Sequence, residues 1–488
     1  MAVKYLLSIL IVPAVIGAAA PGGSAQSDAA LTTAVDQGAN VRGFGAAGDG
    51  QADDTITLEN ALKAANGLVY LPKGTYRITR TIEIDLNALN RAAIVGTGSA
   101  TVVMAGAGPA FHFIGTHEGT AGPSSFKDNV WRRQRMPLVS GLEILGEHPE
   151  AIGLRFEKTM QATLTHVLIR RCRIGVQFVK RNRNPIIDQC HIYHNTQIGV
   201  DFDRVNLHQA IISDSHISYN PVAGIRLFGG EMRNFQIVGN DIEYNYDTGR
   251  EGSADVLIDM TPAGSSFREG TIVGNTIQAR PSPNGANVRL LGGKSLRTAG
   301  LMAITGNLIG SQTHNVHLVD CRGVTISGNS IYSADGHSIW LQDSANIVAS
   351  GNSIDWNPDH RQKRLIDGIR IERCRGVTLS ACIIENSFQG AEQGGGAIEI
   401  AESEDVAVVN SQILDFRHRG IALSQAVRCR VTGCTIINRG RPADAYPSIE
   451  VLSGRDNLIA GNFINPDGLK VASDTATVRG NIETNAAD

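Results

Sequence analysis

A Gly-Asn-x-Ile signature recurs along this chain and constrains its fold more than any other feature. It appears as "GNSI" at Gly328 and again at Gly351, 23 residues later, and related runs continue from Ile186 to Asn457 at spacings of up to about 34 residues. Each unit has the same order: a short β run, a turn, a second β run, a loop, and an apolar alternation such as "AGIRLF" or "SIWLQD". Such a period is too long for a coiled coil and too short for a domain.

Three short strands per repeat are typical of a solenoid in which each coil pairs only with its neighbours. Composition agrees, because 54 glycines, 16 prolines and 5% aromatic residues suit many strands joined by tight turns. We therefore predict an all-β fold: a right-handed parallel β-helix solenoid of about a dozen coils, with an N-terminal capping helix.

The asparagines of the repeat fall at one equivalent position in successive coils. With coils ~4.8 Å apart, inward-pointing amides can hydrogen-bond along the axis as a ladder, and a small thiol or hydroxyl can fill the same slot. We expect these asparagines to be structural. The predicted ladder comprises Asn240, Asn275, Asn307, Asn329, Asn352, Asn462 and Asn481, with Cys190, Ser215, Cys382, Ser411 and Cys434 at the same position in other coils.

The N-terminal segment has two expected parts. Residues 1–26 carry Lys4, an apolar run of 16 residues and then small residues, which is the order of a secretory signal peptide; a membrane anchor is the alternative, although the run is short. Residues 27–80 would hold the cap and first coil, where Asp54 begins a helix with an apolar stripe of Ile56, Leu62 and Ala65. Residues 81–488 would form the β-helix, with a long loop at 112–137.

Cysteines and charge exclude some alternatives. The seven cysteines form neither a metal-ligand pattern nor an obvious disulfide framework, so we expect most of them to be free and buried. The net charge of -3 gives no reason to expect nucleic acid as a partner.

The motifs "GAAGDGQADDT" and "VYLPKGTYRI", within residues 41–79, resemble the N-terminal cap and first coil of the pectate-lyase-like superfamily, with its rhamnogalacturonase/epimerase-like motif. That superfamily includes polysaccharide lyases, polygalacturonase-type hydrolases, alginate epimerases and phage tailspikes. The resemblance implies the fold and a carbohydrate ligand. It implies no catalytic residues, because the "DPHE" and "NTD" signatures of particular members are absent.

The third strand of each repeat predicts an outward column of polar side chains. Neighbouring apolar residues alternate with these positions, so period 2 places the column on the solvent face. A file of arginine, histidine and tryptophan suits an elongated anionic polymer, although an ordinary polar sheet face is the alternative. The column comprises Gln177, Asp201, Arg226, Leu257, Arg289, His317, Trp340, Arg370 and Glu399.

Titratable residues are densest between Gln177 and Asp259. Asp201 and Asp203 share one strand face with Cα atoms ~6.6–7 Å apart, near the lower end of the carboxyl separation in inverting glycosidases. A His-His-acid ladder is expected on the neighbouring strand, beside this pair. The predicted catalytic residues are Asp201, Asp203, Asp241, Glu243, His191, His216 and Arg226. The predicted substrate-binding residues are Arg204, His208, Glu231, Asp259, Arg289, His317, Trp340, Arg370 and, in the long loop, Trp131.

These residues leave several chemistries open. β-Elimination needs a base and a group that neutralises a uronate carboxylate, which arginine or Ca²⁺ can do. Hydrolysis needs an acid and a base carboxylate. We favour an exported (periplasmic or extracellular) polysaccharide lyase acting on an acidic polymer, with glycoside hydrolase, epimerase or transferase, and a noncatalytic carbohydrate-binding protein as alternatives. Ca²⁺ is the candidate cofactor, and Asp201, Asp203 and Asp241 could act as metal or polar ligands. The expected partner is a polysaccharide, without nucleic acid or stable membrane insertion, and the protein would be a monomer or a homotrimer.

Overall fold

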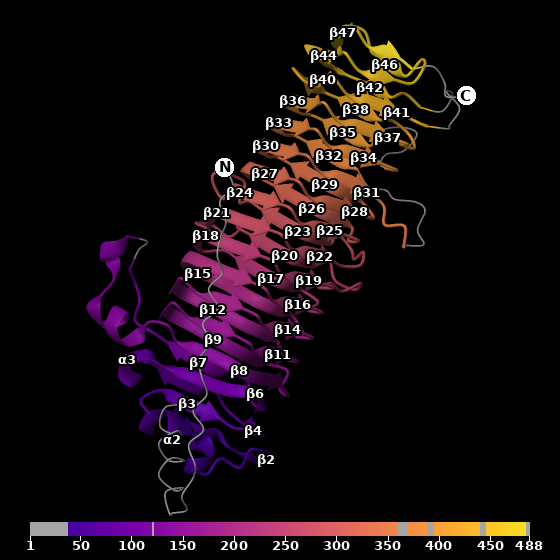
Figure 1. The fold of residues 1–488 in the computed structure, drawn as a ribbon. Helices are drawn as coiled ribbons and strands as arrows, with labels where there is room; N and C mark the ends of the chain where they lie inside the picture. Colours follow the sequence, from indigo (N-terminus) through magenta and orange to yellow (C-terminus); the bar gives the residue numbers. More distant parts are fainter. Residues whose placement is uncertain (1–37, 120–121, 360–367, 388–394, 440–445, 485–488) are drawn as a thin grey trace, which may run out of the picture.

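The computed structural model describes residues 38–119, 122–359, 368–387, 395–439 and 446–484. The expected signal peptide at 1–26 lies outside these residues. The described chain winds into an elongated solenoid whose strands all pair in parallel, each with the equivalent strand of the next coil (Figure 1). The predicted parallel β-helix is therefore confirmed.

Three sheets form the wall of the solenoid, and sheet A runs through the middle of the body in Figure 1. Its strands are β5 (Ile82–Asp85), β7 (Gly108–Ile114), β9 (Ala151–Met160), β12 (Ile174–Arg183), β15 (Ile198–Ser213), β17 (Ala223–Phe228), β20 (Ala254–Asp259), β23 (Ala286–Leu291), β26 (His314–Val319), β29 (His337–Gln342), β32 (Ile369–Glu372), β35 (Ile398–Ala401), β38 (Ile421–Ser424), β42 (Ile449–Val451) and β46 (Leu469–Val471).

Sheet B follows sheet A along the chain, and β15 bends from one into the other. Its further strands are β1 (Ala39–Asn40), β3 (Leu68–Leu71), β6 (Ala93–Met104), β8 (Leu138–Gly146), β10 (Thr163–Thr165), β13 (Ile186–Asp188), β18 (Glu231–Val238), β21 (Ser266–Val273), β24 (Ala299–Thr305), β27 (Cys321–Ser327), β30 (Ala345–Ser350), β33 (Arg375–Ser380), β36 (Glu404–Val409), β40 (Arg430–Thr432), β44 (Asn457–Ala460) and β47 (Ala476–Arg479), with β39 (Ala426–Val427) and β43 (Gly454–Arg455) beside them.

Sheet C closes each coil, and the second halves of β6 and β8 belong to it. Its other strands are β2 (Asp49–Asp53), β4 (Gly74–Ile78), β11 (Leu168–Arg170), β14 (His191–Tyr193), β16 (His216–Ser218), β19 (Asp241–Glu243), β22 (Thr276–Gln278), β25 (Leu308–Gly310), β28 (Ser330–Tyr332), β31 (Ser353–Asp355), β34 (Ile383–Glu385), β37 (Gln412–Leu414), β41 (Thr435–Ile437), β45 (Phe463–Ile464) and β48 (Ile482–Glu483).

The Gly-Asn signature marks the corner between sheets B and C. Gly239 has φ +68°, a left-handed conformation that glycine adopts without steric cost. The following Asn240 points inward and donates from Nδ2 to Asn275 Oδ1 (3.0 Å), and the same bond repeats through Asn307, Asn329 and Asn352. The predicted ladder is confirmed, with Cys190, Ser215, Cys382, Ser411, Cys434, Asn462 and Asn481 in its other rungs.

Two further ladders were not foreseen. Asn195, Asn220 and Asn245 bond one another at the corner between sheets C and A, and the series ends on the buried carboxyl of Asp255. At the corner between sheets A and B, serine and asparagine side chains accept from the backbone of Cys321, Cys374 and Cys429. All seven cysteines are buried and free, as predicted.

The N-terminal end is covered by α2 (Thr55–Ala64), preceded by the short helix η1 (Val41–Phe44). The expected capping helix is present, but its details differ. The Asp54 carboxylate accepts from the backbone of Ala47 and Gly48 instead of capping α2. The buried residues of α2 include Leu58, Ala61 and Leu62, whereas Ile56 is 62% exposed and Ala65 only half-buried.

An insertion separates β7 from β8 in the first coils. It contains two short helices, η2 (Pro123–Ser125) and η3 (Val130–Gln134). The insertion projects from one edge of the body, beside the helix α3 (Leu86–Leu89). The Gln134 side chain holds it in place, since Gln134 donates to Asn87 (3.1 Å) and accepts from the Thr116 backbone (2.8 Å).

Candidate functional site

The outward column predicted on sheet A exists, with its residues in register from strand to strand. Gln177 pairs with Asp201, Asp201 with Arg226, Arg226 with Leu257 and so on through Arg370 to Glu399. The same file extends toward the N-terminus through Arg155, His112 and Glu83. We call this file, from Glu83 to Glu399, the central column.

The expectation that the column is open to solvent is wrong at several positions. Asp201 is 0% exposed, Arg289 3% and His317 5%. Outward-facing residues in a parallel sheet lie only ~4.8 Å apart, so large side chains on adjacent strands cover one another. The column is therefore a packed file whose partly open members include Arg226, Trp340 and Arg370.

The first half of the column satisfies its charges internally. Arg155 Nε donates to Gln177 Oε1 (2.9 Å), and Gln177 Nε2 donates to Asp201 Oδ2 (3.2 Å). Arg226 then binds Asp201 through two hydrogen bonds, of 2.8 and 3.1 Å. A buried carboxylate held by two nitrogens of a guanidinium is braced in place and has little access to a substrate.

The second half begins with a buried cation that has neutral partners. Arg289 Nε donates to His317 Nδ1 (3.1 Å), and Nη2 donates to both oxygens of Asn284. Among the residues that the structure describes, no ion pair involves Arg289. Burial lowers its pKa to about 10, so the guanidinium still carries its charge at neutral pH.

Three histidines and a tryptophan pack beside Arg289. The His317 and His337 rings stack on Trp340, with centroids 4.5 and 5.0 Å away, and His314 lies 5.2 Å from His337. Burial, and then neighbouring cations and histidines, lowers the pKa of His314 to about 2 and those of His317 and His337 to about 4. The three rings are thus neutral at physiological pH. His337 and Trp340 are only half-buried.

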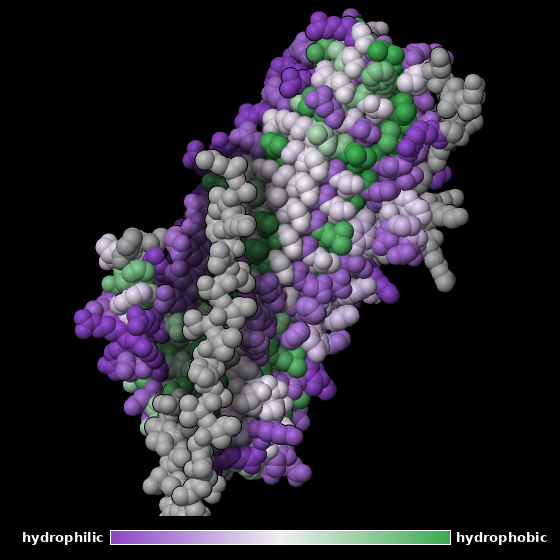
Figure 2. All heavy atoms as spheres, in the orientation of Figure 1, coloured by the Kyte–Doolittle hydropathy of each residue, from purple (hydrophilic) through white to green (hydrophobic). Residues whose placement is uncertain are grey.

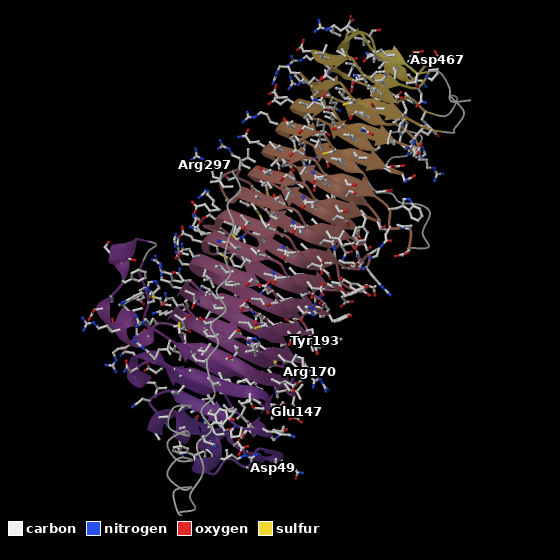
Figure 3. The ribbon with its side chains drawn as sticks, viewed as in Figure 1. Asp49, Glu147, Arg170, Tyr193, Arg297 and Asp467 are labelled. Atoms are coloured by element: carbon white, nitrogen blue, oxygen red, sulfur yellow. The ribbon has the colours of Figure 1, made fainter. Side chains whose placement is uncertain are left out.

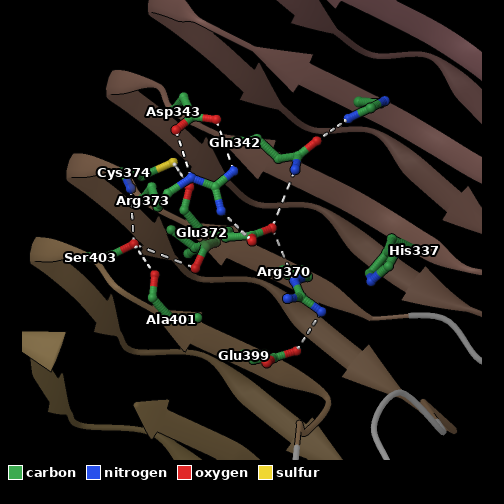
Figure 4. A network of polar contacts seen from close by, with 12 residues as sticks. His337, Gln342, Asp343, Arg370, Glu372, Arg373, Cys374, Glu399, Ala401 and Ser403 are labelled. Atoms are coloured by element: carbon green, nitrogen blue, oxygen red, sulfur yellow. Dashed lines mark hydrogen bonds and ion pairs between the residues drawn. The ribbon is translucent and has the colours of Figure 1, made fainter. Parts of the chain in front are cut away.

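Arg370 connects this cluster to carboxylates of the following coils (Figure 4). It lies 3.4 Å from Glu372 and 3.5 Å from Glu399, with about a third of its side chain exposed. Gln342 completes the network: its Oε1 accepts from His317 Nε2 (2.8 Å), and its Nε2 donates to Glu372 (3.3 Å). We call His337, Trp340 and Arg370 the open trio, because these adjacent side chains reach the surface.

The two carboxylates predicted to act as a pair, Asp201 and Asp203, differ in their exposure to solvent. Asp203 is 29% exposed and pairs with Arg204 (3.1 Å), while Asp201 beside it is buried. Asp259 falls in the same file as Asp203, with Phe228 between them, as predicted. Its carboxylate accepts from the backbone and hydroxyl of Thr261.

The His-His-acid ladder is present, but on another sheet. His191, His216 and Asp241 are in register on β14, β16 and β19 of sheet C, and His216 Nε2 lies 3.8 Å from Asp241 Oδ2. Burial and Asp241 raise the pKa of Glu243 on the same strand. The expectation that this ladder runs beside Asp201 is wrong, because a corner of the coil separates sheet C from sheet A.

The remaining predicted binding residues are dispersed around the edge shared by sheets A and B. Arg204 stacks on Phe228 (4.8 Å to the ring centroid), Glu231 accepts from Asn206 (2.9 Å), and His208 lies 3.4 Å from Asn234. Trp131, 44% exposed, packs in the insertion against Phe126, which in turn lies under Arg183. The role of Trp131 as a sugar contact stays a prediction.

Sequence reasoning missed His314, His337 and Glu372. The two histidines stand first in "HNVHLV" and "HSIWLQ", at a position filled by isoleucine or alanine in the preceding coils from Ile152 to Ala286, so a polar residue at that position was the available signal. None of the described residues forms a group of three or more His, Cys, Asp or Glu that could hold a metal ion. None of the helices in the described ranges has the length and apolar content needed to span a bilayer.

Comparison with known proteins agrees with the fold. The sequence matches the family described as right handed beta helix region over residues 147–277, 260–395 and 295–464, and the family described as rhamnogalacturonase A/epimerase, pectate lyase-like, over residues 38–134. It is 42% identical over 72 residues to alginate lyase 7 and to mannuronan C5-epimerase AlgE3, both of Azotobacter vinelandii. Those matches cover 13% of this chain and only 8% and 4% of the two relatives.

A solved structure shares the architecture over most of the chain. The pre-mature gene product 12 of bacteriophage phi29 aligns with a TM-score of 0.54 at 13% identity, covering 93% of this chain and 58% of that one. At this identity the likeness concerns the fold alone. The family matches extend from residue 147 to 464, and the strands of successive coils pair in parallel. The chain therefore belongs to the right-handed parallel β-helix proteins of the pectate-lyase-like superfamily.

Proposed function

We propose that this protein is a carbohydrate-active enzyme that binds an acidic polysaccharide along sheet A and cleaves it by β-elimination at the open trio. The observation that carries the proposal is Arg289, a buried cation whose hydrogen-bond acceptors are neutral. Arg289 lies two coils from Trp340 and three coils from Arg370 in the central column, so its charge adds to the positive field that an incoming carboxylate would meet there. Export and action as a monomer or homotrimer remain part of this proposal.

The open trio supplies the groups that β-elimination needs. Arg370 would bind the sugar carboxylate, and Trp340 would pack against the sugar ring. His337 would take the proton α to that carboxylate, after which the glycosidic oxygen on the β carbon leaves with the bonding electrons. Acidification of that proton requires neutralisation of the carboxylate, which Arg370 and the field of Arg289 would provide.

Substrate binding would also prepare His337 as a base. Burial, and then Arg370, lowers the pKa of His337 to about 4, which makes it a weak base in the free protein. A bound carboxylate cancels the charge of Arg370, so the pKa of His337 would rise, while burial continues to hold it below its ordinary value. This coupling would confine strong proton abstraction to the loaded site.

The test compares His337→Gln with His194→Gln, whose ring lies at an exposed corner beside Tyr219. Each protein is incubated with polymannuronate, polyguluronate, polygalacturonate and a neutral glucan, and the ultraviolet absorbance of the unsaturated product is followed. Polymannuronate is the first substrate to test, because the matched relatives are an alginate lyase and mannuronan epimerases. We expect the absorbance to rise with one acidic polymer and His337→Gln to lower kcat/KM by ~10²–10³-fold, with His194→Gln unchanged.

A second chemistry is favoured by one observation. Asp203 and Asp259 face the same way two coils apart, ~9.6 Å between Cα atoms, near the upper end of the ~6.5–9.5 Å carboxyl separation of inverting glycosidases. Hydrolysis would produce new reducing ends without the ultraviolet absorbance of an unsaturated product. If Asp203→Asn and Asp259→Asn abolished those reducing ends, hydrolysis would replace elimination as the proposed reaction. Polymer binding without either product would point to a noncatalytic carbohydrate-binding protein.

A further inference from the structure

A second line of cations runs along the solenoid, outside sheet A. Residues near the start of the sheet B strands are in register, and Arg233 pairs with Arg268 in the adjacent coil. Arg322 follows two coils later and Arg375 two coils after that, with Gly300 and Ala345 between them. Together with Arg297, from the loop before β24, these residues form what we call the arginine stripe. Five coil spacings of ~4.8 Å make it about 24 Å long.

The stripe lies on the edge where sheets A and B meet. Figure 2 shows hydrophilic side chains gathered along this edge, around β18, β21 and β24, and Figure 3 shows Arg297 projecting from it. It is therefore separate from the open trio, which belongs to the middle of sheet A. A ligand of suitable length could occupy either surface alone.

The stripe arginines lack acidic partners. No ion pair within the described ranges involves Arg233, Arg268, Arg297, Arg322 or Arg375, although other arginines at the same edge are paired, such as Arg373 with Asp343 and Arg428 with Asp405. Arg233 instead donates to backbone and hydroxyl oxygens of Ser266, and Arg268 to the Arg297 carbonyl. Like charges on adjacent coils repel one another, so an anion would be stabilised between them.

A pocket is formed where the stripe is richest in arginine. Its volume is about 310 Å³, and Arg268, Arg297 and Arg322 line it with Leu296 and Leu301. No aspartate or glutamate contributes to this lining. A neighbouring 500 Å³ depression shares Leu296 and includes Arg375, together with Glu402 and Glu404. The cationic character is thus concentrated at the end nearer β21.

Leu301 is an unusual member of this pocket. Its φ is +50°, and it is 56% exposed. The equivalent positions are Glu269 in the preceding coil, Gly323 in the next coil and Asn346 in the coil after that, and all three also have a positive φ. The left-handed conformation thus belongs to the corner of the coil, and Leu301 is the position at which this corner presents an exposed apolar side chain beside the guanidinium groups.

We propose that the arginine stripe is a second binding site for the acidic polysaccharide, distinct from the cleavage site. Guanidinium groups would pair with the carboxylates of successive sugars, while Leu296 and Leu301 contact the apolar faces of the rings. A single-stranded nucleic acid fits less well, because the pocket has no aromatic side chain on which a base could stack. The site shares its ligand class with the proposed function but none of its catalytic residues.

The test uses the full-length chain carrying His337→Gln, so that the probe is not consumed. Affinity for long polymannuronate is measured by calorimetry with and without Arg268→Glu/Arg322→Glu. The matched control is Arg91→Glu/Arg479→Glu, which changes the net charge equally at two exposed arginines away from the stripe. We expect about a tenfold loss of affinity in the stripe variant, and less than about a twofold loss in the control because isolated exposed charges are screened.

Further outcomes distinguish the two proposals. Tetramannuronate, too short to reach both surfaces, should bind sheet A of the stripe variant as it binds the parent chain. Equal losses in stripe variant and control, or no loss in either, would overturn the second site. Competition by a single-stranded oligonucleotide as strong as that by polymannuronate would overturn its assignment to a glycan. Stripe-dependent binding by a wild-type chain that cleaves no polymer would sustain this site and refute the proposed function.

Discussion

The first half of the central column, from Arg155 to Arg226, pairs its charges internally, whereas the second half, from Arg289 to Glu399, keeps a buried cation beside neutral rings. Both halves share one face and one strand register, so position in the sheet does not explain the difference. The presence of Asp201 does. The buried Asp201 binds the arginine next to it in the file, whereas the neighbours of Arg289 are Leu257 and His317, so the charge of Arg289 stays available to a ligand. Glu399, at the end of the second half, is partly exposed and contacts Arg370 at 3.5 Å.

Loss of the brace should give the largest change in stability. Asp201→Ala removes the partner of Arg226 and the acceptor of Gln177, so we expect the free energy of unfolding to fall by about 3 kcal/mol. Urea unfolding followed by circular dichroism measures it. Arg226→Met in the same chain should restore part of the loss, since no cation is then left unpaired. A change below ~1 kcal/mol in the single variant would show that the two halves do not differ as described.

Acid should affect the second half through its histidines. The folded-state pKa of His317 is lowered from 6.5 to about 4, so below pH 6.5 the unfolded chain binds more protons than the folded one. The contribution is complete above pH 6.5 and is lost as the pH falls toward 4, by at most about 3 kcal/mol. His317→Gln should flatten this dependence and His194→Gln should not, which thermal unfolding across that range measures. If His317→Gln left the pH dependence of stability unchanged, the neutral His317 ring would not contribute to the difference between the two halves.

The smallest effect on stability is expected at Arg370. Its side chain is about a third exposed and its contacts with Glu372 and Glu399 exceed 3.3 Å, so Arg370→Ala should change the free energy of unfolding by less than ~1 kcal/mol. Arg373→Ala, on the same coil but at the edge shared with sheet B, is the control. A loss above ~2 kcal/mol would make Arg370 another brace and weaken its assignment to the substrate.

The coil architecture could be predicted from the sequence because its causes are local. Gly239 and its equivalents adopt the left-handed conformation that the corner requires, and Asn240 and its equivalents hydrogen-bond to one another from coil to coil. Strand alternation then fixes which residues point outward. Register followed from this, so Asp201 and Arg226 were placed on adjacent strands correctly.

Exposure and the relation between sheets could not be predicted in the same way. Asp201 points outward yet is buried, because residues about 24 positions away on each side, Gln177 and Arg226, close over it. The separation of His216 from Asp201 depends on how the chain turns between sheets C and A, which no alternation pattern reports. Likewise, Leu58 and not Ile56 is buried in α2 because the end of the solenoid decides which face is covered.

The buried thiols have a practical consequence. Burial raises the pKa of Cys172 and Cys321 to about 12, and a cysteine reacts with alkylating reagents only as the thiolate. Modification therefore requires the coil that carries the thiol to open. Because the seven cysteines are distributed from Cys172 to Cys434, mass-spectrometric mapping of alkylation would report, from natural side chains alone, where along its axis the solenoid frays first.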